Sequence, residues 1–506
     1  MEKINYSAYQ KAIFNEVLNG TSNVIVNAVA GSGKTFTIVQ CCKMLGLTPK
    51  DVRFMAFNKS IADELTKKVG AYASVKTLHA HGFEILNGIF RNLQVEPNKV
   101  SKFLKANIYS LSTEISVDTA KADVNAAISN VTKIYNLCRV NLIKHGEISA
   151  IKDIIAEHTI DIMFDEVNIV NKMLETAYVM PSNGIIDYTD MICLPLSYIG
   201  HIKTYRYVFV DECQDLNAAQ RELMLATAKG GRFIAVGDPK QAINGFAGAD
   251  CNSFYKIASL PNTKELPLSV NYRCGKKMIA LAKELVPQIE AHEGAIEGEI
   301  TYLRKIEKNT FKPNDMVLCR TSAPLVAMCL KLIQANITAI VKGGDIKETL
   351  LRLVDKAKTS SIKALLNYLD KEQNKLVRVI MREQNCNEED ARNSGRFVSF
   401  VDRCKCIENI AMYSSSVNNI KDYIFKLFND NNTKNAVVFS TCHKAKGLEA
   451  DRVLILLPHK LPLVWKTQLD WQYEQELNLK YVAVTRAKKE LVFVNIEERE
   501  LSSVIL

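Results

Sequence analysis

The chain has 506 residues, more than one hydrophobic core usually supports, so we expect about two to four domains. Its 47% hydrophobic and 24% charged residues are typical of a globular protein, and no apolar run is long enough to cross a membrane. The net charge of +10 is compatible with nucleic acid as a partner. The first residues lack a secretory signal pattern and the 13 cysteines show no zinc-type pairing, so we expect reduced thiols in a soluble intracellular protein.

The first 90 residues alternate between expected strands and helices. Residues 23–28, NVIVNA, form an apolar β-rich run that leads into a glycine-containing loop, and residues 36–45 then follow a helical pattern. Residues 52–57 and 75–86 continue the alternation. This order predicts a parallel sheet covered by helices. From residue 91 to residue 197 strand signals are sparse and apolar residues recur at helical spacing, which predicts a helical insertion.

The same organisation returns in the second half of the chain. An alternating block starts near residue 299 and is interrupted from residue 346 to residue 430 by a helical, charge-rich stretch. Further strands are expected at residues 207–210, 233–236, 316–319, 337–341, 436–440, 452–457 and 491–494. We therefore predict an α/β fold with two domains of parallel sheet, each carrying a mostly helical insertion.

The sequence AVAGSGKT at residues 28–35 has the spacing of a phosphate-binding loop, with alanine at its first position. A strand before it and a helix after it form the unit that such a loop requires. Lys34 is expected to neutralise the β- and γ-phosphates of a nucleoside triphosphate, and Thr35 to bind Mg²⁺. The backbone groups expected to surround the phosphates belong to Ala30, Gly31, Ser32 and Gly33.

Two adjacent carboxylates, Asp211 and Glu212, follow the apolar strand at residues 207–210. An aspartate at this position can hold Mg²⁺, and its neighbour can take a proton from an attacking water. The pair could also be ordinary loop acids, but beside a phosphate loop the catalytic interpretation is favoured. Positive charge at the γ-phosphate accelerates transfer by about 10³–10⁵, and Arg273 and Arg486 are candidates for it, although each could be a surface ion-pair residue.

The order of these motifs resembles that of the superfamily 1A helicases of the UvrD/Rep type, from Tyr9 to Val494. The matching segments are SAYQKAIF (motif Q), AFNKSIADEL (Ia), VKTLHAHGFEIL (Ib), VDECQD (II), VGDPKQAINGFAGA (III), LSVNYRC (IV), STCHKAKGLEADRVLI (V) and LKYVAVTRAKKEL (VI). NAVAGSGKT and NLKYVAVTRA are most similar to the F-box helicase type, and we expect a compact version of that core without the F-box.

The resemblance implies a division into four parts. Two RecA-like P-loop domains are expected, 1A at residues 1–90 with 198–270 and 2A at residues 271–345 with 431–506. Two helical insertions are expected, 1B at residues 91–197 and a short 2B at residues 346–430.

For the nucleotide, the resemblance implies roles for residues outside the phosphate loop. Gln10 is expected to read the adenine edge, Tyr272 to stack on the base and Glu449 to contact the ribose side of ATP. Gln241 is expected to sense the γ-phosphate. The two arginines become cationic fingers supplied by the second α/β domain.

For DNA, the resemblance implies contacts with a single strand. Phe246 is expected to stack on a base, an interaction worth about 1–3 kcal/mol. His79 and His443, taken singly, would more often be buried or capping histidines. The residues at DNA-contacting positions are Phe57, Asn58, Thr77, His79, Phe246 and His443.

Three residues depart from the family pattern. Asn244 replaces a tyrosine and Ala247 an arginine in motif III, and Asn478 replaces an arginine in motif VI. These replacements bear on the coupling between DNA binding and hydrolysis rather than on hydrolysis itself. Trp465 and Trp471, just before motif VI, are expected to be packing residues rather than a platform on which bases stack.

The resulting hypothesis is an ATP- and Mg²⁺-dependent DNA helicase or translocase that moves 3′→5′ on single-stranded DNA, in replication, repair or recombination. Expected partners are single-stranded DNA, single-strand/duplex junctions and replication or recombination proteins, with the chain acting as a monomer. Its compartment would be the cytoplasm in a bacterium or phage. The alternatives are a translocase that strips proteins from DNA, and a non-motor nucleotide-binding protein that also binds nucleic acid. RNA is a further candidate substrate, although motifs Ib and V are similar to those of DNA motors.

Overall fold

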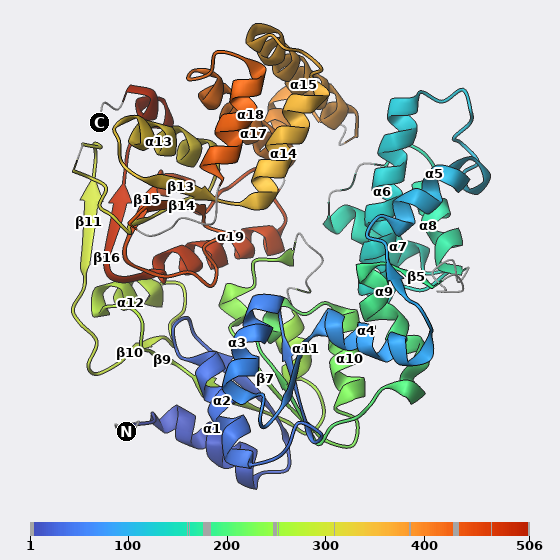
Figure 1. Ribbon diagram of the computed structural model, residues 1–506, viewed down its shortest axis with the longest axis vertical. Helices are drawn as coiled ribbons and strands as arrows, with labels where there is room; N and C mark the ends of the chain where they lie inside the picture. Colours follow the sequence, from blue (N-terminus) through green and yellow to red (C-terminus); the bar gives the residue numbers. More distant parts are fainter. Residues whose placement is uncertain are drawn as a thin grey trace. The chain divides into compact units, whose positions relative to one another are not determined.

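The computed structural model describes residues 5–158, 160, 162–175, 184–245, 250, 252–307, 309–383, 386–428, 435–466 and 468–503. The chain divides into two compact units, shown with their elements in Figure 1. The first comprises residues 1–28 and 33–269, and the second comprises residues 29–32 and 270–506. In the described ranges no helix combines the length and apolar character needed to span a membrane.

The first unit is built on a six-stranded sheet in the order β3-β2-β6-β7-β1-β8, and every neighbouring pair is parallel. The strand β6 is buried along its whole length, as expected for a sheet with helices on both faces. The strands are β1 (Asn23–Ala28), β2 (Val52–Ala56), β3 (Ser74–Thr77), β6 (Tyr207–Val210), β7 (Arg232–Gly237) and β8 (Thr263–Leu268).

Two apolar clusters lie against this sheet. One includes Ile13, Ile38 and Leu65 from helices α1, α2 and α3, and the other includes Leu223 and Phe254 from α10 and α11. Parallel strands between two such layers end at one common edge, where ligands of α/β proteins usually bind. The helices are α1 (Ala8–Asn19), α2 (Lys34–Leu45), α3 (Lys59–Val69), α4 (Leu78–Ile89), α10 (Ala218–Thr227) and α11 (Ser253–Ala258).

The helical part of the first unit has its own apolar core, formed by residues such as Leu104, Val131 and Ile169. Next to this core lies a buried group of charges, in which Arg139 pairs with Asp187 and Asp190, and Lys99 pairs with Asp190 at 2.8 Å. The elements are α5 (Lys99–Leu111), α6 (Lys121–Val140), α7 (Ile148–Glu157), α8 (Glu166–Glu175), α9 (Tyr188–Cys193), β4 (Gln94–Val95), β5 (Ile185–Ile186) and the 3₁₀ segment Leu194–His201.

The Arg139→Met variant should lower the free energy of unfolding by about 3–5 kcal/mol, because Asp190 is fully buried and would lose an ionic partner. Urea denaturation measures this change. Lys102→Met is a matched control, because Lys102 forms an exposed pair with Glu96 and should cost about 1 kcal/mol or less. Equal losses in the two variants would contradict a stabilising role for the buried charges.

The second unit contains another six-stranded parallel sheet, in the order β11-β16-β15-β12-β14-β13. Its strands are β11 (Glu299–Leu303), β12 (Met316–Cys319), β13 (Ala339–Lys342), β14 (Val437–Thr441), β15 (Ala450–Leu456) and β16 (Ala487–Val494). A short pair, β9 (Val270–Asn271) and β10 (Glu290–Ala291), begins this unit, which also contains α12 (Lys276–Lys283), α13 (Ala323–Gln334) and α19 (Asp470–Val484).

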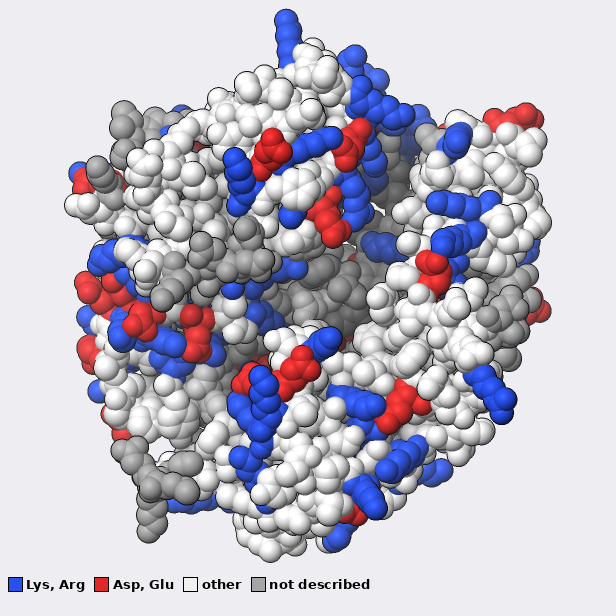
Figure 2. Space-filling model, in the orientation of Figure 1, with Lys and Arg blue, Asp and Glu red and all other residues white. Residues whose placement is uncertain are grey.

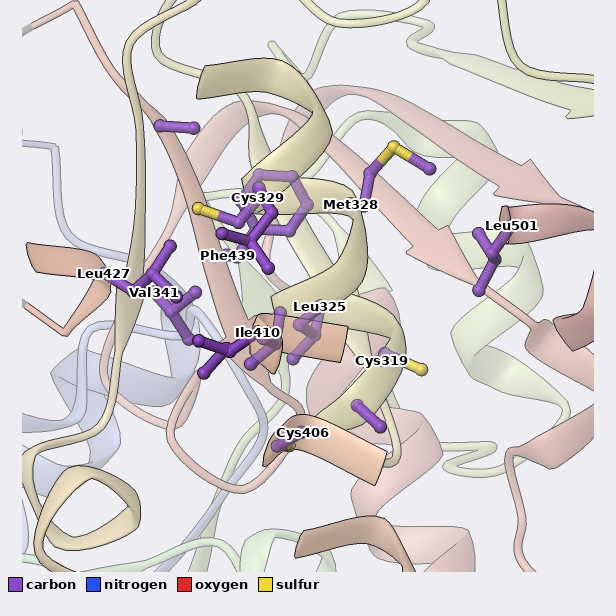
Figure 3. Packing of buried hydrophobic residues seen from close by; sticks show 14 of the residues in the cluster. Cys319, Leu325, Met328, Cys329, Val341, Cys406, Ile410, Leu427, Phe439 and Leu501 are labelled. Atoms are coloured by element: carbon purple, nitrogen blue, oxygen red, sulfur yellow. The ribbon is translucent and has the colours of Figure 1, made fainter. Parts of the chain in front are cut away.

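In this unit the sheet and the inserted helices share one apolar core. Val341 and Phe439 from the strands pack in the same cluster as Cys406, Ile410 and Leu427 from the helices (Figure 3). The inserted helices are α14 (Gly344–Lys356), α15 (Ile362–Glu383), α16 (Glu388–Arg392), α17 (Gly395–Ala411) and α18 (Val417–Leu427). The far end of α15 has a small separate cluster, in which Val377 and Ile380 pack against α16 and α17.

The predicted fold class is confirmed, since both halves of the chain form parallel sheets covered by helices. The strands expected from the apolar runs are present, and their limits lie within two residues of the expected ones except at β16, which begins at Ala487, four residues before the expected start. The division into 1A, 1B, 2A and 2B stays a prediction.

Candidate nucleotide and DNA sites

The phosphate loop connects β1 to α2 and depends on two glycines. Gly31 and Gly33 have φ values of +65° and +78°, a region that other residues rarely adopt. A Cβ on Gly31 would lie 2.6 Å from the Asn271 Nδ2 atom, so the loop also needs glycine there for space. Gly33 precedes the first turn of α2 and has no side chain with which to cap it. The backbone N–H groups of that turn can therefore bind an anion.

The predicted catalytic groups of the first unit lie together at the end of β6. The Thr35 hydroxyl donates a hydrogen bond to the Asp211 Oδ2 atom at 2.6 Å. The Lys34 Nζ atom lies 3.7 Å from the Glu212 Oε1 atom. Glu212 has a φ of +55°, which is strained for a residue other than glycine and common at functional sites. This conformation turns the chain directly after β6.

The site fits a magnesium ion by its chemistry. Burial, together with the neighbouring Glu212 charge, raises the pKa of Asp211 to about 6. Ionising a buried carboxylate costs free energy, and a bound cation stabilises the ionised form. Mg²⁺ prefers oxygen ligands, which a carboxylate and a hydroxyl provide. Asp211 and Thr35 are the residues that would hold it.

The affinity for Mg²⁺ should be constant above about pH 6 and fall about tenfold per pH unit below it, because a proton then competes for Asp211. With the ordinary carboxyl pKa of 3.8, this fall would begin about two units lower. Titration of the nucleotide-free protein with Mg²⁺ at a series of pH values measures the effect, because the phosphates of a nucleotide would themselves titrate in this range. The Asp211→Asn variant should bind Mg²⁺ more weakly without this step, and an unchanged step in the variant would exclude Asp211 as its origin.

A buried chain of hydrogen bonds connects Gln241 to Glu212. The Gln241 amide donates to the Asp238 Oδ2 atom at 2.6 Å, the Asp238 N–H donates to the Gln214 Oε1 atom at 3.0 Å, and the Gln214 amide donates to Glu212 at 2.6 Å. Sequence reasoning missed Asp238 and Gln214, although both stand inside the quoted segments VGDPKQ and VDECQD. These hydrogen bonds connect Gln241 to Glu212, the expected catalytic base.

The structure describes two of the three residues that depart from the family pattern. Asn244 donates a hydrogen bond to the Asp215 Oδ1 atom at 3.1 Å, so this residue joins the same polar group behind motif II. Phe246 and Ala247 lie outside the described residues. Asn478, the departure in motif VI, is buried within α19.

In the second unit, Arg273 and Arg486 are held by different kinds of partner. The Arg273 Nε atom lies 2.6 Å from the Glu449 Oε2 atom, and Lys488 lies 2.6 Å from the Glu449 Oε1 atom. Burial alone would raise the pKa of Glu449, but hydrogen bonds and charges from Lys488 and Arg273 lower it. Arg486 is almost fully buried and donates to the carbonyl oxygens of Val482 and Leu448.

The tip of the phosphate loop, residues 29–32, belongs to the second compact unit. Three hydrogen bonds connect it to other residues of that unit. The Ala30 N–H donates to the Tyr481 hydroxyl at 2.8 Å, and the Ala30 carbonyl accepts from the Asn271 amide at 2.6 Å. The Tyr272 N–H donates to the Gly31 carbonyl at 2.9 Å. Sequence reasoning missed Tyr481 and Asn271, because a local motif does not show which backbone groups its polar side chains reach.

The same tyrosine is linked to the buried arginine. The Tyr481 carbonyl accepts from both the N–H and the hydroxyl of Thr485, and the Thr485 hydroxyl accepts from Arg486 at 3.1 Å. The Thr485 carbonyl accepts from Arg273 at 3.4 Å. One turn at the end of α19 thus positions the loop tip and both arginines.

The Tyr481→Phe variant should weaken ATP binding by about fivefold or more, because the buried Ala30 N–H would lose its partner at a cost of about 1–3 kcal/mol. Titration with a fluorescent ATP analogue measures the affinity. Tyr473→Phe, an exposed tyrosine of the same helix, is the matched control and should bind ATP as the wild type does. Equal affinities in the two variants would show that the hydroxyl does not position the loop.

The two residues expected at the adenine base have different surroundings. Gln10 is buried, and its side chain accepts from the Ser7 N–H and donates to the Thr37 hydroxyl at 3.2 Å. Tyr272 is 43% exposed, and its ring centre lies 4.8 Å from that of His292. Their roles at the base stay predictions, and Tyr272 has a free ring surface for stacking.

The expected DNA-contacting residues of the first unit follow the strands β2 and β3. Phe57 is 40% exposed. Asn58 and Thr77 each cap a helix, accepting from the Ile61 N–H at 2.9 Å and the Ala80 N–H at 3.1 Å. Both side-chain oxygens act as acceptors in these caps, and the Asn58 amide N–H groups and the Thr77 hydroxyl proton are left to donate to DNA. Burial lowers the pKa of His79, which keeps its imidazole neutral.

His443 follows β14 in the second unit. Burial and the positive charges of Arg320 and Lys444 lower its pKa to about 3, so it is neutral at physiological pH. Arg320, which sequence reasoning missed, follows β12 and forms a bidentate pair with Glu476, with Nε–O distances of 2.8 and 3.0 Å. Arg320 and His443 thus lie at the ends of neighbouring strands. A fixed cation such as Arg320 suits a phosphate, and a neutral imidazole such as that of His443 suits a base edge or a sugar.

Comparison with known proteins identifies the family. Residues 9–261 match the UvrD/REP helicase N-terminal domain, and residues 332–498 match the UvrD-like helicase C-terminal domain. The chain belongs to the UvrD/Rep helicase family. The first match alone covers half of the chain.

Several curated proteins are similar to this chain. The ATP-dependent DNA helicase Rep of Buchnera aphidicola is 26% identical over 52% of the chain and 40% of its own length. F-box DNA helicase protein 1 of Schizosaccharomyces pombe is 23% identical over 96% of the chain and 56% of its own length. The ATP-dependent DNA helicase PcrA of Staphylococcus aureus is 22% identical over 94% of the chain and 82% of its own length. The chain thus spans about half the length of the first two relatives.

Proposed function

We propose that this chain is an ATP-dependent DNA helicase or translocase that moves 3′→5′ along single-stranded DNA. The observation that carries the proposal is the group formed by Lys34, Thr35, Asp211 and Glu212 at the ends of β1 and β6. The names of the relatives, which are ATP-dependent DNA helicases or a DNA helicase, support the choice of DNA. We further propose Mg²⁺ as the cofactor, a monomer as the working form, and replication or recombination proteins as partners.

In this proposal each residue has a chemical task. The first-turn amides of α2 and Lys34 bind the phosphates of ATP. A bound Mg²⁺ would neutralise charge on the transferred phosphoryl group. Glu212 accepts a proton from the attacking water, and the chain through Gln214 and Asp238 keeps it oriented toward Gln241. Arg273 and Arg486 supply positive charge for the transition state.

Substitutions at two of these residues should separate binding from chemistry. Lys34→Ala should abolish ATP binding and hydrolysis, because the main cation for the phosphates is lost. Glu212→Gln should keep binding and reduce kcat by about 10²–10⁴, because only proton transfer is lost. Lys43→Ala, an exposed lysine of the same helix, is the control and should behave as the wild type does. Nucleotide binding and steady-state ATPase assays measure both quantities.

The function itself is tested with wild-type protein. Single-stranded DNA should stimulate the ATPase, and duplexes with a 3′ tail should be unwound in preference to those with a 5′ tail. Unwinding only from 5′ tails would reject the polarity, and stimulation by RNA alone would reject DNA as the substrate. Removal of a bound protein from DNA without strand separation would support the translocase alternative.

A further inference from the structure

A hollow of about 310 Å³ opens between α15 and α17 in the second unit. Its lining includes aliphatic and aromatic side chains next to cations. The residues that matter here are Glu372, Lys375, Leu376, Arg396, Phe400 and Arg403. None of these residues belongs to a motif quoted above, so the hollow is a separate feature of the helical segment.

A second hollow, of about 270 Å³, lies directly beside the first. It is lined by Arg320, Thr441 and His443, which follow the strands β12 and β14, and by Ser399 of α17. Arg403 lines both hollows. The two therefore form one path from the ends of the strands, across α17, to α15.

The path carries an excess of positive charge. Three cations and one carboxylate line the hollow between α15 and α17. In the described ranges neither Lys375 nor Arg403 forms an ion pair. The acid next to Arg403, Asp402, already accepts the N–H groups of Ser322 and Ala323 at 2.8 Å. Figure 2 shows Lys and Arg side chains gathered over the helical segment at the top of the view, beside fewer acidic ones.

An aromatic ring accompanies these cations. The Arg403 guanidinium lies 5.7 Å from the Phe400 ring centre, and Phe400 is only partly buried. Cations next to an aromatic surface are typical of sites for single-stranded nucleic acid, where phosphates bind the charges and an unstacked base binds the ring. A duplex keeps its bases stacked, and an acidic peptide offers the ring no base, so these two ligands fit the hollow less well.

We propose that single-stranded DNA bound at Thr441 and His443 continues across Arg403 into the hollow between α15 and α17. The proposal rests on the proposed function, and it extends the DNA path beyond the helicase motifs. In it, Lys375, Arg396 and Arg403 bind successive phosphates, and Phe400 contacts a base.

The Lys375→Ala/Arg396→Ala double variant tests the proposal. Its affinity for a length series of oligothymidylates is measured by fluorescence anisotropy at several salt concentrations. With long oligonucleotides the slope of log K against log salt should fall by about 1.4, since each lost phosphate contact contributes about 0.7. With oligonucleotides too short to reach α15 the variant should bind as the wild type does.

A matched control removes the same charge elsewhere on the unit. Arg304→Ala/Lys305→Ala also loses one arginine and one lysine, both exposed after β11, at the opposite edge of the sheet from β13. This control should keep the wild-type slope at every length. Phe400→Leu should weaken long-oligonucleotide binding by about 5- to 150-fold at constant charge, because stacking is worth about 1–3 kcal/mol per base.

The outcomes are distinguishable. Loss confined to long oligonucleotides in the double variant, with an unchanged control, supports the path. An unchanged double variant or an equal loss in the control overturns it. If wild-type ATPase is not stimulated by any single-stranded DNA, the proposed function itself fails, whereas stimulated wild type with an unaffected double variant rejects only the path.

Discussion

The hydrogen bond from Thr35 to Asp211 joins two residues that are 176 positions apart in the chain. It forms because β1 and β6 are parallel strands separated only by β7, so the loop after one and the carboxylates after the other reach the same edge of the sheet. The sheet of the first unit and the phosphate loop together bring Thr35 and Asp211 into contact. The buried strands fix where β1 and β6 end, and Gly31 and Gly33 let the loop backbone turn tightly enough for Thr35 to reach the Asp211 carboxylate.

In both units, burial is the largest influence on the charge state of the titratable groups at the candidate sites. Burial and the neighbouring Glu212 charge raise the pKa of Asp211, whereas burial lowers the pKa of His79. Burial and the charges of Arg320 and Lys444 lower the pKa of His443. The proposed DNA path of the second unit therefore obtains its positive charge from side chains such as Lys375 and Arg403 rather than from His443. Binding on such a surface depends on salt more than on pH between neutrality and mild acidity.

The fold class followed from the sequence because strand–helix alternation is a local pattern. The apolar runs NVIVNA and YVFV are continuous, as expected of strands covered on both faces, and both are central strands of the sheet. The catalytic ends of these strands were predictable for the same reason. Tyr481 and Asn271 were not, because each reaches the backbone of Ala30 from more than 200 positions away. The capping roles of Asn58 and Thr77 do have a local signal, because each is a polar residue directly before a helix.

The apolar core of the second unit limits how this chain can be altered. Helices α14, α17 and α18 pack together with α13 in one cluster around Val341 and Phe439, so the inserted helices supply part of the interior next to the strands. Truncating residues 346–430, or exchanging them for the insertion of a longer relative, would expose that interior to water and favour aggregation. In the first unit the separate core around Leu104 and Val131 makes the corresponding graft far less disruptive. The two halves are each built on a six-stranded parallel sheet, but they differ in how readily their inserted helices can be exchanged.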